Sequence, residues 1–499
     1  MELEFDIHFQ YALDLANNTN QSFFLTGKAG TGKSTFVKYL IENTNKNLLL
    51  LAPTGIAAIN IGGSTIHSFF GFHPGINMNE LKDHFMAKDK YEVLKNADCI
   101  IIDEVSMLRA DLVDIIDAFI QKLLKNYEYF GGKQIVFVGD VYQLPPIVRK
   151  EEKEFFSKNY DTYFFFSSQA YQGLNPITIE LQKIHRQQDM IFKRVLNRIR
   201  NGIQTHKDLM YLNTRVTNKP NTDEFVISLV TTNKIATEIN MSNLKEIESE
   251  EYVIPAEISG EVPEGYYAND KIVRFKIGSQ IMMVKNGENR KNGTLGKLTF
   301  FDEDTKTSTV EINGIEYQIP FAEWNIRKPR YDKHQNVIVN EIVGSFRQVP
   351  FKLAWGITIH KSQGMTFENI FLDFGDKLFA SGQGYVAISR VTSMKGLFMK
   401  RPLRKSDIFL DSGIIEFIGK SLLDQKIRLL EDFYSQRKTI RFYYLKRGVF
   451  TEYINYSIIN IEEKIFEGRN YFGVDLENSK SKNVQTFAVQ NMYEIEDCT

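Results

Sequence analysis

The stretch of chain that most constrains the fold is a glycine-rich loop between a predicted strand and a predicted helix. Residues 27–35 read Gly-Lys-Ala-Gly-Thr-Gly-Lys-Ser-Thr, which satisfies the pattern G-x-x-x-x-G-K-[ST]. An apolar run at 22–26 precedes the loop, and residues 35–41 have the character of a helix start. In this setting backbone N–H groups and a helix N-terminus bind a polyphosphate. A chance match in a surface turn is the alternative, but the flanking elements favour a nucleoside-triphosphate site.

Two side chains of this loop carry the chemistry of phosphate transfer. The Lys33 ammonium is predicted to reach the β- and γ-phosphates, and the Ser34 hydroxyl is predicted to bind Mg²⁺. The predicted nucleotide contacts of the loop are Gly27, Ala29, Gly30, Thr31, Gly32, Lys33, Ser34 and Thr35.

Composition limits the size, the partners and the compartment. The chain has 499 residues, of which 43% are hydrophobic and 25% charged, enough for about three globular domains. Because the formal net charge is −1, no overall positive field attracts nucleic acid, and any nucleic-acid site must be a local groove. The two cysteines, Cys99 and Cys498, exclude a disulfide scaffold or a cysteine metal cluster. With no signal-peptide pattern and no apolar run of membrane-spanning length, we expect an intracellular protein without membrane contact.

Apolar strand patterns divide the chain into regions. To about residue 175, short apolar runs alternate with helical patterns, which is typical of a parallel sheet covered by helices. Further apolar runs at 177–181, 225–230 and 370–374 predict a second α/β domain. Between about 271 and 344, Asn-Gly pairs separate short strands, which favours a small inserted β-barrel. We therefore predict an α/β fold with a first ATPase domain at 1–64 and 93–175, an insertion at 65–92, a second domain at 176–270 and 345–425, the barrel at 271–344 and a C-terminal β-rich domain at 426–499.

Two acids follow the apolar run at 99–102, where a strand of a parallel sheet would end. Ligands of α/β folds bind at this edge of the sheet. Asp103 is suited to an outer ligand position on Mg²⁺, and Glu104 is suited to polarising the attacking water. An acidic cap on the helix that follows is the alternative, but an earlier phosphate loop in the same chain favours catalysis.

Three further polar residues are candidates for the catalytic site. Gln143 follows the strand pattern at 135–138 and is suited to sensing the γ-phosphate, although a rigid turn around Pro145 is the alternative. Arg186 and Arg390 follow these elements along the chain. An arginine delivered from a partner domain stabilises charge on the transferring phosphoryl group. Composition alone would leave both arginines as solvated surface residues.

The motifs, taken in order, resemble those of a known family. They are the loop at 27–35, the segments 51–58 and 62–69, the acids at 103–104, and the segments 139–146, 181–187, 359–364 and 385–390. In order and spacing they resemble superfamily 1B DNA helicases, in particular the Pif-type (petite integration frequency) family, with RecD and Dda-like helicases as relatives. The segments 130–134, 275–283 and 292–296 are similar to that family's own signatures. The resemblance covers roughly residues 10–400.

This resemblance implies a fold and an activity. The fold would hold two RecA-like P-loop domains, a wedge inserted at 65–92 and an SH3-like β-barrel at 271–344. The activity would be ATP-dependent translocation from 5′ to 3′ on single-stranded DNA, with unwinding at single/double-strand junctions and of G-quadruplex DNA. The family also implies roles in DNA repair, recombination and telomere maintenance. We expect a monomer, with a DNA-dependent dimer as the alternative, and a bacterial, cytoplasmic and nucleoid-associated protein.

The resemblance also implies roles for individual residues. Gln10 matches the glutamine that recognises adenine, and Gly364 joins the nucleotide contacts. Arg186 and Arg390 match the two arginines that reach the γ-phosphate across the interdomain cleft. The implied DNA contacts are Pro53, Thr54, Gly55, Ser64, Thr65, His67, Phe69, Thr358, His360, Lys361, Ser362 and Gln363.

The chemistry of these DNA contacts fits a motor that does not read sequence. Hydroxyls such as those of Ser64 and Thr358 bond phosphate oxygens whatever the base. Phe69, the first of three phenylalanines with Phe70 and Phe72, is predicted to stack on a base, at about 1–3 kcal/mol. A small local core is the alternative for this trio.

The region after about residue 425 lies outside the helicase motifs. Strand patterns at 440–445, 453–459, 470–474 and 486–489 predict a β-rich domain. It faintly resembles a WYL-type domain, with Tyr471-Phe472-Gly473-Val474 at the position of the name-giving triplet, but the Trp and Leu are missing. Packing, regulation and nucleic-acid binding therefore stay open as its role.

Three readings compete with an autonomous helicase. A single-strand translocase could need a partner to separate duplexes, and a small-molecule phosphotransferase could use the same phosphate loop. A binding module with a decayed ATPase is the third, but Lys33, Asp103, Glu104 and Arg390 are all present.

Overall fold

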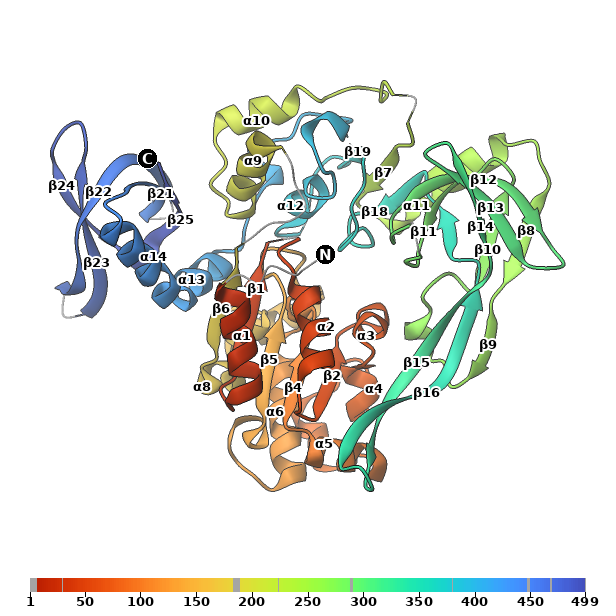
Figure 1. Cartoon of the computed structure of the whole chain (residues 1–499), viewed down its shortest axis with the longest axis horizontal. Coiled ribbons are helices and arrows are strands. Elements are labelled where there is room, and N and C mark those ends of the chain that lie inside the picture. The colour runs from red at the N-terminus through yellow and green to blue at the C-terminus, as the bar shows by residue number, and fades with distance from the viewer. Residues whose placement is uncertain are drawn as a thin grey trace.

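The chain forms two α/β domains flanked by two β-rich parts. The computed structural model describes residues 7–28, 30–182, 189–222, 224–287, 290–378, 380–446, 449–466 and 469–498. In Figure 1 the first α/β domain lies below the second, a β-rich insertion lies on the right, and the C-terminal β-rich domain lies on the left. The predicted α/β class with two P-loop-type domains is confirmed.

Six parallel strands form the sheet of the first domain, in the spatial order β3-β2-β4-β5-β1-β6. Alternate residues face two apolar layers, so that Phe24 and Ile100 enter one core and Phe23 and Ile101 the other. Strands buried on both faces read as continuous apolar runs, which is why the sequence identifies them. The strands are β1 (Phe23–Gly27), β2 (Leu48–Ala52), β3 (Ser64–Thr65), β4 (Cys99–Ile102), β5 (Gln134–Val138) and β6 (Ile177–Leu181).

The last of these strands corrects the predicted division of the chain. The run at 177–181 was assigned to the second domain, whereas β6 pairs in parallel with β1 and closes the edge of the first sheet. An apolar run shows that a strand is present but not which sheet receives it, so the boundary at 175–176 is wrong.

Eight α-helices surround this sheet in the described part of the domain. The segment predicted as an inserted wedge, 65–92, contributes α4, a short 3₁₀ helix and the start of α5. Phe70 and Phe72 of this segment pack on Phe119 of α6, with ring centroids 6.2 and 5.4 Å apart. The segment therefore shares the hydrophobic core of the first domain. The helices are α1 (Ile7–Asn18), α2 (Lys33–Asn43), α3 (Gly55–Ile61), α4 (Ile66–Phe70), α5 (Lys88–Asn96), α6 (Ala110–Leu124), α7 (Lys153–Asn159) and α8 (Gln169–Leu174).

The second domain has a four-stranded parallel sheet in the order β18-β7-β19-β20. Its core joins this sheet to α9 and α12 and is separate from the cores of the first domain. The strands are β7 (Ile227–Val230), β18 (Gly356–Thr358), β19 (Ile370–Asp373) and β20 (Leu397–Met399), and the helices are α9 (Met190–Arg200), α10 (His206–Asn213), α11 (Asn233–Glu246) and α12 (Gln383–Ile388).

Antiparallel strands form the β-rich insertion, which is longer than the predicted 271–344. Strands β8 and β9 precede this range and pair with β10 and β16, while β17 follows it and pairs with β11. As predicted, the Asn313-Gly314 pair turns the chain between two strands, and both residues have the positive φ that a tight hairpin needs. The strands are β8 (Glu251–Pro255), β9 (Glu257–Gly260), β10 (Ile272–Lys276), β11 (Gln280–Met283), β12 (Leu295–Asp302), β13 (Thr307–Ile312), β14 (Ile315–Ile319), β15 (Ala322–Asp332), β16 (Val337–Gln348) and β17 (Phe351–Leu353).

One long hairpin of this insertion reaches the first domain. Strands β15 and β16 run down beside the first domain in Figure 1. Near the tip, the Ile338 N–H donates to Asn47 Oδ1 at 2.9 Å, and Lys333 pairs with Glu92 at 3.8 Å. The hairpin therefore fixes the insertion to the side of the first sheet on which β2 and α5 lie.

The C-terminal part begins with two helices and ends in a five-stranded sheet of order β24-β23-β22-β21-β25. The predicted boundary at residue 426 falls inside α14, so the boundary is wrong, because a helix that packs on this sheet belongs with it. The elements are α13 (Ser412–Ser421), α14 (Leu423–Ser435), β21 (Thr439–Lys446), β22 (Val449–Phe466), β23 (Arg469–Asn478), β24 (Val484–Ala488) and β25 (Met492–Asp497). Among the described residues, no helix has both the length and the apolar character that a membrane crossing requires.

Candidate ATPase site and DNA surface

The phosphate loop joins β1 to α2 as the sequence predicts. Gly32 precedes α2 with a φ of 97°, a left-handed conformation that glycine adopts without steric cost. A Cβ on Gly27 would lie 2.8 Å from the Leu181 carbonyl oxygen, so β6 approaches the start of the loop closely. Of the predicted loop contacts, Ala29 lies outside the described residues. Gly27, Gly30, Thr31, Gly32, Lys33, Ser34 and Thr35 all lie on the loop or in the first turn of α2.

Lys33 folds back over this loop. Its Nζ donates to the carbonyl oxygens of Gly27 at 2.7 Å and Lys28 at 3.2 Å. Burial lowers the pKa of Lys33, while the negative charges of Asp140, Glu104 and Asp103 act in the opposite direction. The ammonium thus lies among the acids at the strand ends and bonds carbonyls that a phosphate could replace as acceptors.

Asp103 and Glu104 follow β4 at the carboxyl edge of the sheet. Both residues are half-buried. Burial raises the pKa of Asp103, and burial together with the Asp103 charge raises the pKa of Glu104 to about 7. Glu104 also has a φ of 52°, a left-handed conformation that costs a non-glycine residue about 1–2 kcal/mol. Such strain is concentrated at functional sites.

A magnesium ion fits the donors that these residues supply. The Ser34 hydroxyl is exposed at the start of α2, and the Asp103 carboxylate interacts electrostatically with the adjacent Lys33. Hydroxyl and carboxylate oxygens are hard donors of the kind that Mg²⁺ prefers.

The second domain contributes a glutamine to this cluster. Gln363 Nε2 donates to Gln143 Oε1 at 2.8 Å and approaches Glu104 Oε2 at 3.5 Å. Gln143 in turn donates to Asp140 Oδ2 at 3.3 Å. Gln363, predicted as a DNA contact, therefore lies in the cleft against the predicted catalytic residues of the first domain.

Arg390 is buried directly after α12 and supports the loop that carries Gln363. Its Nη1 donates to the carbonyl oxygens of Met365 at 3.1 Å and Ser362 at 3.4 Å, and its Nε donates to Val386 at 2.8 Å. Its positive charge opposes the rise in the pKa of Glu104. Arg186, the other predicted arginine, lies outside the described residues.

The sequence-based prediction missed Arg200, at the end of α9. Its guanidinium pairs with Asp140 and Glu180, each at 3.1 Å, and lies 4.0 Å from the ring centroid of Tyr142. The signal was present, because position 200 lies four residues after Leu196 on the apolar face of an amphipathic helix. A charge on such a face is rarely buried without a partner.

The predicted DNA contacts of the first domain lie around the carboxyl ends of β2 and β3. Pro53, Thr54 and Gly55 connect β2 to α3, where Thr54 caps the helix. Tyr266 of the β-rich insertion contacts β3, where its hydroxyl accepts a hydrogen bond from the Thr65 N–H at 2.6 Å. His67 is half-buried, and burial lowers its pKa.

Two predicted DNA contacts of the first domain have little exposed surface. Ser64 and Phe69 are both only 2% exposed. Phe69 packs edge-on against Phe70, with ring centroids 5.1 Å apart. The stacking role predicted for Phe69 is therefore wrong for this conformation, and the alternative of a local core describes the trio, because apolar burial holds the rings inside.

The predicted contacts of the second domain follow β18. Lys361 is exposed, His360 is half-buried with its pKa lowered by burial, and Thr358 and Ser362 are buried. Ser362 Oγ donates to the Ile359 carbonyl oxygen at 2.8 Å. A cavity of about 240 Å³ is lined by Thr358 and Lys361 together with two more basic residues, Lys352 and Arg274.

Two predicted nucleotide contacts lie outside the loop. Gln10 is exposed in the first turns of α1, and Gly364 is exposed in the loop after β18.

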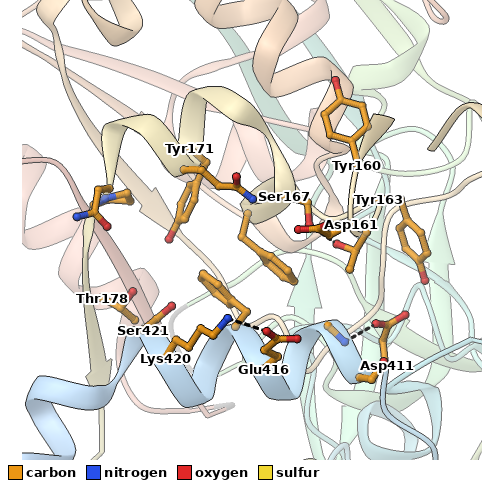
Figure 2. A pocket seen from close by; sticks show the side chains of 18 of the residues that line it. Tyr160, Asp161, Tyr163, Ser167, Tyr171, Thr178, Asp411, Glu416, Lys420 and Ser421 are labelled. Atoms are coloured by element: carbon orange, nitrogen blue, oxygen red, sulfur yellow. Dashed lines mark hydrogen bonds and ion pairs between the residues drawn. The ribbon is translucent and has the colours of Figure 1, made fainter. Parts of the chain in front are cut away.

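A larger cavity lies away from all these residues. It measures about 1230 Å³ and separates α7 and α8 from α13 (Figure 2). Tyr160, Tyr163 and Tyr171 line one side, while Glu416 and Lys420 pair with each other on α13 at 2.6 Å. Within the described chain, none of the residues predicted to bind nucleotide or DNA lines it.

Comparison with known proteins identifies close relatives. A family model described as PIF1-like helicase matches residues 8–209. The ATP-dependent DNA helicase Pif1 of Campylobacter jejuni is 32% identical over 442 residues, which cover 81% of this chain and 96% of that protein. The human ATP-dependent DNA helicase PIF1 is 30% identical over 393 residues, covering 76% of this chain. The chain spans 58% of the human relative and 65% of the zebrafish relative.

Solved structures show the same likeness in three dimensions. Bacteroides sp Pif1 in complex with ADP-AlF4 superposes with a TM-score of 0.78 at 34% identity, covering 85% of this chain and 98% of that one. Bacteroides Pif1 bound to ssDNA superposes with a TM-score of 0.60 at 35% identity, covering 83% of this chain and 96% of that one.

Proposed function

The chain belongs to the PIF1-like helicase family, and from this premise we propose that it is an ATP-dependent DNA helicase that translocates 5′ to 3′ on single-stranded DNA. The observation that carries the proposal is the contact of Gln363, in the second domain, with Gln143 and Glu104 in the first. Gln363 donates across the cleft to a candidate base and a candidate sensor, and these bonds couple the chemistry at the phosphate loop to the position of the second domain.

The proposed chemistry assigns each residue of the cleft a task. Lys33 neutralises the β- and γ-phosphates, Glu104 orients and activates the attacking water, and Gln143 senses the γ-phosphate. Arg390 and Arg186 offset the charge that develops on the phosphoryl group. A magnesium ion held by Ser34 and Asp103 would supply Lewis-acid neutralisation of the phosphate oxygens. Gln10 contacts adenine, and Gly364 and the loop glycines approach the nucleotide.

The proposed DNA path crosses the carboxyl ends of β2 and β18. Pro53, Thr54, Thr65 and His67 of one domain and His360 and Lys361 of the other would grip the backbone. The basic cavity beside Lys361 and Lys352 supports this path, because phosphate binding needs local positive charge in a chain with a net charge of −1.

Closure and reopening of the cleft would drive the steps. ATP binding draws the two domains together and changes the spacing of the two DNA grips, and hydrolysis releases them. The TM-score is lower with the ssDNA-bound relative, at 0.60, than with the ADP-AlF4 complex, at 0.78. This difference supports a rearrangement of the domains on DNA binding.

The relatives guide the choice of substrate and assembly. Solved relatives include Bacteroides Pif1 bound to ssDNA and two coordinating Pif1 helicases at forked dsDNA. We propose that this chain acts at single/double-strand junctions as a monomer, with paired action at forks as the alternative. G-quadruplex unwinding, a role in DNA repair and a cytoplasmic, nucleoid-associated location complete the proposal.

Strand separation of one duplex that carries either a 5′ or a 3′ single-stranded tail tests this function. We expect separation of the 5′-tailed substrate alone. Separation of the 3′-tailed substrate alone would overturn the polarity. ATPase activity that DNA stimulates, without strand separation, would favour the partner-dependent translocase, and ATPase activity that DNA does not stimulate would favour the phosphotransferase.

The variant Lys33→Ala tests the assignment of the ATP site. Removal of the ammonium should abolish ATP hydrolysis while single-strand binding changes less than about threefold, because Lys33 lies in the cleft and not on the proposed DNA path. Phosphate release and fluorescence anisotropy measure the two activities, and hydrolysis retained in the variant would refute the site assignment.

A further inference from the structure

A glutamine from the C-terminal part of the chain completes the edge of the first sheet. The Glu180 N–H donates to Gln425 Oε1 at 3.1 Å, and Gln425 Nε2 donates to the Glu180 carbonyl oxygen at 3.1 Å. Because β6 is an edge strand, these groups of Glu180 face away from β1. The side chain of Gln425 therefore occupies the place of a residue in a neighbouring strand. Gln425 Nε2 also lies 3.0 Å from His8 Nε2 on α1.

This contact lies beside the start of the phosphate loop. In the parallel pairing of β1 and β6, Glu180 is opposite Thr26 and Leu181 is opposite Gly27. The Gly27 carbonyl oxygen accepts from Lys33 Nζ. Displacement of β6 at Glu180 would therefore also displace Gly27, whose carbonyl oxygen accepts the hydrogen bond from Lys33.

The side chain of Glu180 connects the same position to the γ-phosphate side of the cleft. Glu180 Oε1 accepts from Arg200, and Arg200 pairs with Asp140. Asp140 accepts from Gln143, which accepts from Gln363. Each of these bonds joins buried or half-buried groups, where a lost partner leaves a polar group unpaired.

The C-terminal part that carries Gln425 contacts both motor domains. Phe417 of α13 stacks on Phe166 of the first domain, with ring centroids 4.1 Å apart and planes inclined by 3°. Tyr443 and Tyr493 of the C-terminal sheet pack with Ile203, which follows α9 of the second domain. Gln425 is thus held on a unit that is fixed on both sides of the cleft.

We propose that Gln425 is a positioning residue for ATP binding, acting through β6 on the phosphate loop and through Glu180 and Arg200 on Gln143. The inference rests on the proposed ATPase function. Gln425 holds β6, which supports the nucleotide site, and does not contact the reacting atoms. Its loss should therefore weaken nucleotide binding and leave the rate of the chemical step unchanged.

Three variants of the full chain test this role. Gln425→Met keeps the length of the side chain and removes its hydrogen bonds. Gln425→Glu keeps the shape and an acceptor for the Glu180 N–H but sets a carboxylate oxygen against the Glu180 carbonyl. Gln436→Met, at the C-cap of the same helix, is the matched control, since the Gln436 amide donates to Asp432 of that helix.

The assay is ATP hydrolysis at saturating single-stranded DNA over a range of ATP concentrations. We expect both Gln425 variants to raise KM for ATP about threefold to tenfold with kcat changed less than twofold, and Gln436→Met to match the wild type. Single-strand binding without nucleotide and the melting temperature should stay at their wild-type values, which a general loss of structure would alter.

The outcomes separate this inference from the proposed function. If the wild type shows no DNA-stimulated ATP hydrolysis, the proposed function fails. If the wild type is active and either Gln425 variant that melts at the wild-type temperature has an unchanged KM, the positioning role is overturned. If Gln425→Met melts early, the isosteric Gln425→Glu decides.

Discussion

Glu104 combines a strained backbone with an electrostatically costly position. Its φ of 52° is a left-handed conformation, and burial beside Asp103 raises the pKa of its carboxyl group to about 7. Neither feature stabilises the fold. Strained backbone and strongly shifted pKa values are found together mainly at functional sites. A carboxylate with a raised pKa is the more basic one, which suits the activation of water.

Removal of this charge should separate binding from chemistry. We expect Glu104→Gln to lower kcat for ATP at least about 100-fold, because the amide cannot take a proton from water. ATP binding should persist, since Lys33 and the loop remain. Rapid-quench hydrolysis and equilibrium binding of labelled ATP measure the two effects, and a normal turnover number would exclude Glu104 as the base.

Arg200 is the centre of a buried ion cluster and should matter to stability. The Arg200 side chain is 2% exposed, and Arg200→Met leaves Asp140 and Glu180 without the guanidinium that pairs with both. Breaking a buried pair in this way costs about 3–5 kcal/mol. Chemical denaturation measures the loss. The double variant Arg200→Met/Asp140→Asn should lose less than the sum of the single variants, and strictly additive losses would contradict coupling within the cluster.

At the scale of elements, the Phe417 ring joins α13 to aromatic side chains of the first domain. Phe417 projects between α8 and the short 3₁₀ helix at 165–167, where it stacks on Phe166 and lies 5.9 Å from Tyr171. Phe417 lines the large cavity of Figure 2, while the buried Ile414 and Ile418 of α13 enter the same core of the first domain.

Truncation of this side chain should loosen α13. We expect Phe417→Ala to lower the free energy of unfolding by roughly 2–3 kcal/mol, below the range for a fully buried phenylalanine because Phe417 is partly exposed. Tyr434→Ala on α14, where the residue is 52% exposed, should cost less than about 0.5 kcal/mol. Thermal and urea unfolding measure both, and equal losses would contradict an anchoring role for Phe417.

The elements that sequence predicted best are those with local signals. The strand, loop and helix around Lys33 and the Asn313-Gly314 hairpin follow from apolar runs, glycine positions and turn chemistry over a few residues. The assignment of β6 failed because pairing with β1 joins segments about 150 residues apart, and nothing within the run at 177–181 specifies that partner.

For the candidate site as well, the sequence predicted the residues with local motif signals and missed those that depend on long-range packing. Motifs identified Lys33, Asp103, Glu104 and Gln143 as cleft candidates, and the structure brings their side chains together. The partners of Arg200 and the cleft position of Gln363 depend on packing between domains, which neither motif spacing nor composition encodes. Burial of Phe69 reflects the same limit, because one apolar residue fits a core and a stacking platform equally well.

For the whole molecule, stability should depend on pH through Lys426 of the C-terminal part. Its Nζ donates to the Gln490 carbonyl oxygen at 3.2 Å and lies 4.5 Å from the ring centroid of Tyr493. Lys426 is half-buried, and its ammonium group lies against the Gln490 carbonyl and the Tyr493 ring. Burial lowers the pKa of Lys426 from 10.5 to about 7, with the charge of Glu180 acting in the opposite direction.

The sign of the effect follows from the protons bound in each state. Between about pH 7 and pH 10.5 the unfolded chain keeps the Lys426 proton and the folded chain releases it. The contribution of this group to stability therefore rises with pH across that window, and below about pH 7 its full destabilising effect is present. Lys426→Met removes the effect.

The melting temperature of Lys426→Met relative to the wild type should therefore be higher at pH 6.5 than at pH 9.5, by a few degrees. Circular dichroism at both pH values measures this difference. Lys420→Met on the exposed face of α13 is the control and should show the same offset at both pH values. An offset for Lys426→Met that does not change with pH would contradict an enclosed ammonium group.

The contact between Gln425 and Glu180 also fixes an order of events during synthesis. The two residues are 245 positions apart, so ribosomes that add about 5–20 residues per second expose β6 for about 12–50 s before its edge is covered. An uncovered edge strand is a template for pairing with other chains. The nascent first domain therefore spends that interval open to association with a neighbouring nascent chain, and synonymous codons that slow translation between residues 181 and 425 should lower the soluble yield without changing the finished protein.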